Sequence, residues 1–250
     1  IAQDDKWDRR QARRILDTYS NLTTLAALGR PELVVWPETA TPSSFFLDPE
    51  VEHVVRSLVE EGNFTLLFGT FGIRPGRENQ PHRYYNTAVL LSPGETAPPQ
   101  SYHKIHLVPF GEYVPFRKIL PFLANFVPIG SDIVPGSEQA VFTLQPSGLR
   151  AAPLICFEDV FPALARQRAR DGADLFVNLT NDAWYLESAG AFQHAANSVL
   201  RCVETRRPMI RCANTGVSCW IDSCGIIRGL GMPPFTTSYR VTDEIIIPRH

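Results

Sequence analysis

Residues 150–179 read RAAPLICFEDVFPALARQRARDGADLFVNL, and this stretch decides the fold. Its two apolar runs, Arg150–Cys156 and Asp174–Leu179, have the length and composition of buried strands. Pro162–Asp171 lies between them and has the pattern of a helix. A strand, a helix and a second strand in this order are typical of a crossover between parallel strands. The stretch therefore predicts an α/β fold.

The rest of the chain alternates between helix-like and strand-like patterns in the same way. Residues 33–71 form a second expected crossover unit, and the strands within residues 65–108 are expected to pair antiparallel. Helices are expected at Asp5–Leu28, with Asp4 or Asp5 as its cap, Pro49–Glu61 and Ala189–Arg206. Strands are expected at Leu33–Trp36, Thr65–Phe71, Asn86–Leu91, Ser101–Val108, Pro208–Ala213, Ser218–Ile221 and Ile226–Arg228. The sum is a protein with sheets inside and helices outside.

Composition excludes several classes of protein. The 250 residues are 44% hydrophobic, which suits one large domain over 1–250. The net charge is -2, so nothing in the composition suggests nucleic-acid binding. No apolar run reaches the roughly 18 residues that a membrane span needs, so the chain as given is expected to be soluble or peripheral. No signal peptide is visible, and the abrupt start at Ile1 suggests that upstream sequence has been cut away.

One long excursion, from about Gly111 to Gly136, interrupts the alternation and is rich in proline, phenylalanine, leucine and isoleucine. Proline disfavours regular helix and strand, so we expect much of this segment to be loop. Apolar side chains on a loop need a cover, and an exposed apolar patch usually marks a partner or a membrane surface. The excursion is therefore interpreted as a lid-like segment. The alternative is a loop that folds back onto its own core.

Three reactive side chains each follow a short apolar stretch: Glu38, Lys104 and Cys156. A thiol at a turn from strand to helix can use helix N-terminal amides to favour thiolate and to stabilise an oxyanion. A carboxylate at a strand end can act as a general base. Taken alone, each side chain also has an ordinary structural interpretation. Glu38 could be a loop acid, Lys104 a lysine that snorkels at a sheet edge, and Cys156 a buried structural cysteine.

Other candidates are weaker. Glu112 could hold Lys104 in place as a second carboxylate. His103 and His106 are three residues apart on an expected strand and so would point to opposite faces, which argues against a metal site. The five cysteines contain no CxxC pair, so no metal or redox centre is expected, and no cofactor either. Cys219 and Cys224 either pair across a hairpin or, with the others, are free thiols.

Together the three segments resemble a known pattern. VVWPETA at 34–40, HKIHLVPFGEY at 103–113 and LICFE at 154–158 resemble motifs of the nitrilase (carbon–nitrogen hydrolase) superfamily, with its Glu, Lys, Cys order. NLTNDAW at 178–184 adds to this. Within the superfamily the motifs are most similar to the catalytic domain of bacterial apolipoprotein N-acyltransferases, and the likeness covers nearly the whole chain.

The resemblance implies a nitrilase-like four-layer α-β-β-α sandwich. It also implies roles, position by position: Cys156 as nucleophile, Glu38 as general base, Lys104 as the cation for the oxyanion, the backbone N–H of Phe157 as a second donor, and Glu112 and Glu158 as supporting carboxylates. Phenylalanine at position 157 departs from the family, where tyrosine is usual, and the membrane helices of full-length members are missing.

The implied activity is acyl transfer. A fatty acyl chain would pass from a phospholipid to the cysteine as a thioester, and then to the N-terminal α-amine of a diacylglyceryl-cysteine apolipoprotein. The partners would include a membrane surface or the missing membrane helices, at the periplasmic face of a bacterial inner membrane; without them the chain would be a soluble cytoplasmic protein. Two alternatives stay open: a soluble amidase that hydrolyses a small C–N bond, and a non-catalytic binding domain that keeps the fold.

Overall fold

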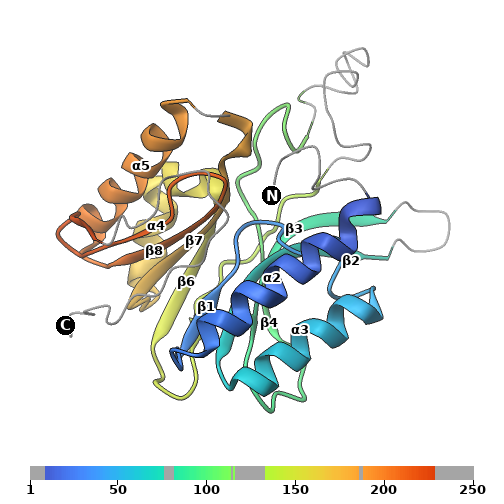
Figure 1. Ribbon diagram of the computed structural model, residues 1–250. Helices are drawn as coiled ribbons and strands as arrows, with labels where there is room; N and C mark the ends of the chain where they lie inside the picture. Colours follow the sequence, from blue (N-terminus) through green and yellow to red (C-terminus); the bar gives the residue numbers. More distant parts are fainter. Residues whose placement is uncertain (1–8, 76–81, 114, 116–132, 186–187, 229–250) are drawn as a thin grey trace.

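The computed structural model describes residues 9–75, 82–113, 115, 133–185 and 188–228 (Figure 1). Most of the excursion predicted at 111–136 therefore lies outside the described residues, as does the helix cap predicted at Asp4 or Asp5. Within the described ranges, no helix combines the length and the hydropathy that would carry it across a bilayer.

The first sheet has four strands in the order β1-β2-β3-β4. Its edge strand β1, Leu33–Val35, runs parallel to β2, Thr65–Arg74, and α3, Pro49–Gly62, connects the two. β2 and β3, Arg83–Leu91, form an antiparallel pair, and β4, Gln100–His103, continues it. The predicted crossover at 33–71 and the antiparallel pairing after it are confirmed.

The second sheet has six strands in the order β10-β9-β8-β7-β6-β5. β6, Arg150–Ile155, β7, Leu175–Asn181, and β8, Met209–Asn214, are parallel and form its centre. The crossover helices are α4, Pro162–Arg170, and α5, Gly190–Thr205. The edges are antiparallel strands: β5, Phe142–Thr143, β9, Cys219–Ile221, and β10, Ile227–Arg228.

Helix α3 shows how local sequence sets an element. Asp48 caps it by accepting hydrogen bonds from the backbone N–H groups of Glu50 and Val51, and Pro49 occupies its first turn, where a missing N–H costs nothing. Asn63 ends it in a left-handed conformation with a φ of 49°. Three valines at four-residue spacing face the sheet: Val51, Val55 and Val59.

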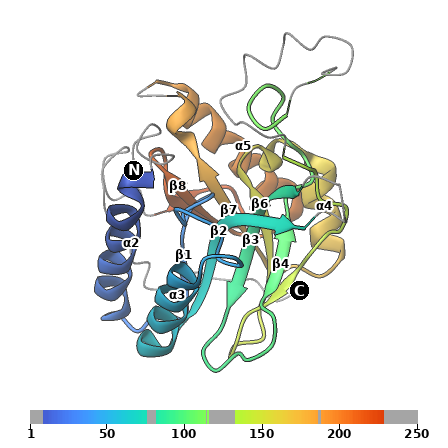
Figure 2. The ribbon, with the colours of Figure 1, turned by 90° about the vertical axis from the view of Figure 1, so that its right-hand side faces the viewer.

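The two sheets face each other, and helices cover their outer faces, so the order is α-β-β-α (Figures 1 and 2). Alternate residues of each strand build separate cores. In β2, Phe68 packs outward under α3 and α2, Ala12–Ala27, whereas Leu67 packs inward against the second sheet. In β6, Leu154 faces α4 and α5, and Ile155 faces the first sheet. The predicted four-layer sandwich is confirmed.

The strand predicted at Ser101–Val108 is wrong in its second half, because β4 ends at His103. Lys104 still donates its N–H to Asn86 in β3, but the N–H groups of Ile105 and His106 donate to the carboxylate of Glu158. The side chain of Glu158, which follows β6 of the second sheet, thus takes the place of a neighbouring strand. Lys104 therefore lies just beyond the end of the strand and not within it.

The inward core predicts a contrast between two leucines. Leu67 is fully buried between the sheets, and Leu28 is 79% exposed after α2. We expect Leu67→Ala to lower the free energy of unfolding by about 2–5 kcal/mol, because a cavity is left between two sheets. Leu28→Ala should change it by less than about 0.5 kcal/mol. Urea denaturation of both variants tests this, and equal losses would contradict the buried position of Leu67.

Candidate active site

Lys104 is the buried cation at the end of β4. Its side chain is 1% exposed, and its Nζ lies 3.2 Å from Glu38 Oε1 and 2.8 Å from Glu112 Oε2. Burial by itself lowers the pKa of Lys104, but the charges of Glu38 and Glu112 outweigh it and hold the pKa well above its ordinary value. The predicted contacts of Lys104 with both carboxylates are therefore present, and the lysine is charged.

Asn86 of β3 also binds both carboxylates. Its Nδ2 donates to Glu38 Oε1 at 2.7 Å and to Glu112 Oε1 at 2.8 Å. The N–H of Val108 donates to the second oxygen of Glu112 at 2.9 Å. Neither carboxylate is free to turn, because Asn86 and Lys104 fix both. Sequence reasoning missed Asn86, and its signal was an amide within an apolar strand.

Glu38 sits in a loop that lies directly on β2. A side chain at Gly69 would clash with this loop, because a Cβ there would lie 2.5 Å from Thr39 N and 2.6 Å from Pro37 O. Glycine is thus required where the loop crosses the strand. Thr39 itself has a φ of 44°, a left-handed conformation that turns the chain after Glu38. The local backbone therefore aims the carboxylate inward, where it is 6% exposed.

Cys156 is the first residue of the short helix η3, Cys156–Val160, immediately after β6. Its φ is 50°, in the left-handed region that residues with a Cβ seldom adopt. Burial raises the pKa of the Cys156 thiol to about 12; the charge of Glu38 adds to this and that of Lys104 opposes it. Glu38, Lys104 and Cys156 therefore act on one another electrostatically, although they belong to separate parts of the chain.

Glu158 is fully buried beneath Cys156 and links the two sheets. Its Oε1 accepts hydrogen bonds from the Tyr102 hydroxyl at 2.7 Å and from the N–H of Ile105 at 2.8 Å. Its Oε2 accepts from the N–H of Ile155 at 2.8 Å. This side chain holds the ends of β4 and β6 side by side. Phe157, next to it, packs edge-on against Phe161, with ring centroids 5.4 Å apart.

The weaker candidates have structural contacts. His103 stacks on Tyr85, and His106 stacks on Phe161. The described ranges contain no group of His, Cys, Asp and Glu side chains arranged to hold a metal. All five cysteines lie in the described part of the chain, and none of them, including Cys219 and Cys224, forms a disulfide. The hairpin disulfide is therefore not present.

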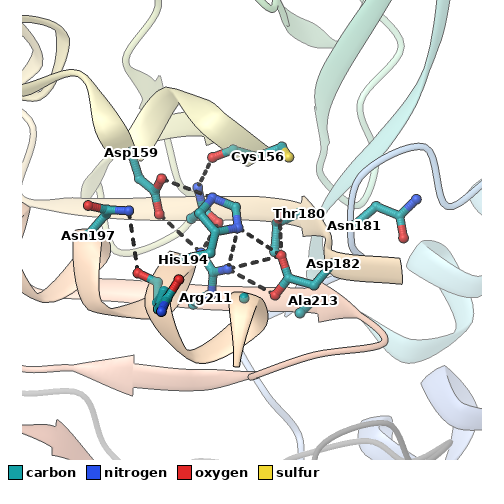
Figure 3. Close-up of polar contacts among 12 residues, drawn as sticks. Cys156, Asp159, Thr180, Asn181, Asp182, His194, Asn197, Arg211 and Ala213 are labelled. Atoms are coloured by element: carbon teal, nitrogen blue, oxygen red, sulfur yellow. Dashed lines mark hydrogen bonds and ion pairs between the residues drawn. The ribbon is translucent and has the colours of Figure 1, made fainter. Parts of the chain in front are cut away.

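A buried cluster of charges lies behind Cys156 (Figure 3). It consists of Asp159 and Asp182, each fully buried, with His194 and Arg211, which are 3% and 1% exposed. His194 Nδ1 lies 2.8 Å from Asp182 Oδ1, and its Nε2 lies 3.1 Å from Asp159 Oδ1. Arg211 lies 3.1 Å from Asp159 Oδ2 and 3.0 Å from Asp182 Oδ2. Sequence reasoning missed these contacts.

His194 in this cluster is charged. Burial lowers its pKa, but the hydrogen bonds to Asp159 and Asp182 outweigh it and raise the pKa to about 9, against the opposing charge of Arg211. An imidazolium donates from both ring nitrogens, which matches a carboxylate on each side. The cluster therefore holds two negative and two positive charges in a site closed to water.

The sequence profile described as carbon-nitrogen hydrolase matches residues 6–240. The chain therefore belongs to the carbon-nitrogen hydrolase family. Among solved structures, it resembles an amidase of the nitrilase superfamily from Nesterenkonia AN1, with a TM-score of 0.65, 20% identity, and coverage of 89% of this chain and 82% of that one. This likeness concerns the fold.

Curated relatives are more similar in sequence. An apolipoprotein N-acyltransferase of Geobacter metallireducens is 40% identical over 231 residues, which are 92% of this chain and 43% of that protein. One of Allorhizobium ampelinum is 36% identical over 237 residues, or 92% of this chain and 44% of that protein. The chain thus spans less than half the length of the curated relatives that it matches.

His194 predicts a pH dependence of stability. Its pKa of about 9 in the folded protein exceeds the ordinary 6.5, so its contribution is fully present below pH 6.5 and is lost as the pH rises through 9. The loss is on the order of 3 kcal/mol in the free energy of unfolding. Urea denaturation from pH 6 to 10 should show this decline, and His194→Gln should flatten it. An unchanged decline in the variant would contradict the raised pKa.

Proposed function

We propose that this chain is the acyl-transferring domain of an apolipoprotein N-acyltransferase, with Cys156 as its nucleophile. The observation that carries the proposal is the pairing of Lys104 with Glu38 and Glu112 beside a thiol held in a left-handed backbone. The substrate class is supported by relatives of that name, which match 92% of the chain at 36–40% identity.

In the first half-reaction, Glu38 accepts the thiol proton, and Sγ of Cys156 attacks the carbonyl carbon of a phospholipid acyl ester. The tetrahedral intermediate collapses to a thioester. The ester C–O bond breaks, and the departing lysophospholipid oxygen takes the proton back from Glu38. A base is needed because the thiol pKa is about 12, so that the neutral thiol predominates near pH 7.

In the second half-reaction, the α-amine of the lipid-modified N-terminal cysteine of an apolipoprotein attacks the thioester. The C–N bond forms, the C–S bond breaks, and a proton of the amine passes through Glu38 to the departing thiolate. The product is an amide, and Cys156 is again a thiol. In each half-reaction Glu38 takes up one proton and gives it back, so the reaction balances without a cofactor.

Lys104 in this scheme stabilises the oxyanion of both tetrahedral intermediates. The N–H of Phe157 is proposed as the second donor, since it follows the nucleophile at the start of η3. Glu112 keeps Lys104 in place, and Glu158 fixes the backbone on either side of the site. Two fixed donors on one oxygen cost no reorganisation when the charge develops.

We also propose that this domain works at a membrane surface, because its substrates are lipids. Large apolar side chains are exposed in two segments that continue from the site: Phe110, after Lys104, and Trp184, after β7, are 47% and 48% exposed. Tryptophan side chains such as that of Trp184 are enriched at membrane interfaces, because one end of the indole is apolar and the other is polar. The excursion at 111–136 is proposed to act as its lid.

A small-amide hydrolase is the second candidate, because the amidase from Nesterenkonia AN1 has the same fold. The two functions share the thioester step and differ in the acyl donor and in the acceptor. The acyltransferase would use a phospholipid as acyl donor and an amine as acceptor. The amidase would use a small amide as donor and water as acceptor. The variant below separates both from a binding domain without catalysis.

Cys156→Ala should abolish acyl-enzyme formation, because the thioester sulfur is gone. The protein is incubated with phospholipid vesicles and measured by intact mass spectrometry, where the wild type gains the mass of one acyl chain. Cys224→Ala, which removes an exposed thiol, is the matched control and should acylate like the wild type. A thioester in Cys156→Ala would disprove the assignment. Turnover of small amides without any phospholipid-derived acyl-enzyme would favour the amidase.

Lys104→Met keeps the length of the side chain and removes the charge. We expect the acylation rate to fall by about 10²–10³, the usual effect of losing one oxyanion donor. The variant should also be less stable, because two carboxylates lose their cation, so the rate is measured at a temperature where circular dichroism shows it folded. A near-wild-type rate would show that Lys104 is only a structural ion-pair partner.

A further inference from the structure

The strained backbone of Cys156 is held from the neighbouring strand. Asn178 of β7 donates its Nδ2 to the carbonyl oxygen of Cys156 at 3.1 Å. A left-handed residue with a Cβ persists only where its surroundings fix it, and this hydrogen bond is one such restraint. Asn178 is fully buried, so its amide finds no water to compete for that donor. The direction of this one amide therefore bears on where the thiol points.

Arg211 fixes the direction of that amide. Its Nη1 donates to Asn178 Oδ1 at 2.9 Å. A guanidinium can only donate, so the oxygen of Asn178 must face Arg211 and the nitrogen must face Cys156. Arg211 is held in turn by Asp159 and Asp182, through both of its terminal nitrogens. If the amide of Asn178 were flipped, its NH₂ group would face the guanidinium of Arg211, and neither group could accept the hydrogen bond.

Asp159 ties the short helix itself to the same cluster. It lies three residues after Cys156 in η3, and it accepts hydrogen bonds from His194 at 3.1 Å, Ser198 at 2.6 Å and Arg211 at 3.1 Å. A helix of five residues has little stability of its own. The contacts of this one carboxylate therefore anchor the turn that begins at the nucleophile.

Thr180 lies close enough to Cys156 for its hydroxyl to lower the pKa of the thiol, against the larger effect of burial. In the structure, however, its Oγ1 donates to Asp182 Oδ1 at 3.2 Å. One hydroxyl proton cannot serve both acceptors at once. Asp182 also accepts from His194 and Arg211, so it stays satisfied when the hydroxyl turns toward sulfur. The hydroxyl of Thr180 is thus available to donate to the sulfur when the thiol loses its proton.

We propose that the cluster of Asp159, Asp182, His194 and Arg211 (Figure 3) is a positioning device for Cys156. It sets the backbone of Cys156 through Asn178, and through Asp182 it holds the Thr180 hydroxyl near the thiol. The proposal rests on the proposed role of Cys156 as the nucleophile. Buried ion pairs contribute little net stability compared with apolar packing. In this cluster, however, the side chain of Asn178 contacts both Arg211 and the carbonyl oxygen of Cys156, and Asp159 belongs to the short helix that begins at Cys156.

The test measures the reactivity of the thiol and needs no lipid substrate. The wild type and variants are alkylated with iodoacetamide from pH 7 to 10, and the rate at each cysteine is followed by peptide mass spectrometry. Cys224 is exposed and serves as the reference within the same molecule. The other titratable groups that bear on Cys156 are unchanged in all variants: Glu38, Lys104, Glu112 and Tyr185.

Thr180→Val keeps the shape of the side chain and removes the hydroxyl. We expect the alkylation profile of Cys156 to move up by about one pH unit, which is about tenfold slower at a fixed lower pH. Thr180→Ser restores the hydroxyl and should stay within about threefold of the wild type. Cys224 should react at the same rate in all three proteins. Wild-type kinetics at Cys156 in Thr180→Val would overturn the role of the hydroxyl.

Arg211→Lys tests the cluster itself, because it keeps the charge but loses the fork that holds Asn178. We expect a Cys156-specific change of about tenfold or more in the alkylation rate, with Cys224 unaffected. An unchanged rate in the folded variant would overturn the proposal. If the variant does not fold, the Thr180 pair decides. If the Thr180 effect appears but no acyl-enzyme forms with phospholipid, it is the proposed function that fails and not the positioning.

Discussion

The site depends on the hydrogen bonds that the carboxylate of Glu158 accepts. This carboxylate is fully buried, and it accepts hydrogen bonds from Tyr102 in the first sheet, from Ile105 just after that sheet's last strand, and from Ile155 in the second sheet. A buried charge is tolerable only when its oxygens are satisfied, and here the donors come from both halves of the molecule. Lys104 directly precedes one of these donors, and Cys156 directly follows another. The carboxylate that joins the sheets thereby places the cation and the thiol.

In the resting protein, the surroundings of Cys156 keep its thiol un-ionised. Burial and the nearby carboxylates raise the pKa of Cys156 to about 12, although Lys104 pulls it down. Lys104 is itself balanced by Glu38 and Glu112. A neutral thiol is a poor target for oxidants. In the proposed reaction, Cys156 becomes nucleophilic only when a substrate is present and a base takes its proton. Activation would then belong to the reacting complex and not to the free protein.

Much of this could be predicted from the sequence, and the rest could not for physical reasons. The apolar runs at 150–179 predict their crossover because burial on both faces leaves a local pattern. The four layers came from resemblance to a family. The end of β4 at His103 could not be predicted, because Glu158, more than 50 residues later, takes the N–H groups of Ile105 and His106. Asn86 was hidden in the same way, as a polar residue inside an apolar strand.

The distances along the chain between the parts of the site have a consequence for folding. Lys104 and Glu38 are 66 residues apart, and Arg211 and Asp159 are 52 apart. Contacts of such separation form late, because the chain entropy of closing long loops is lost before they contribute stability. Under the proposed function, a chain that is only partly folded would therefore have a cysteine without its base or its cation. Such a molecule would be unable to trap an acyl group until both sheets have docked.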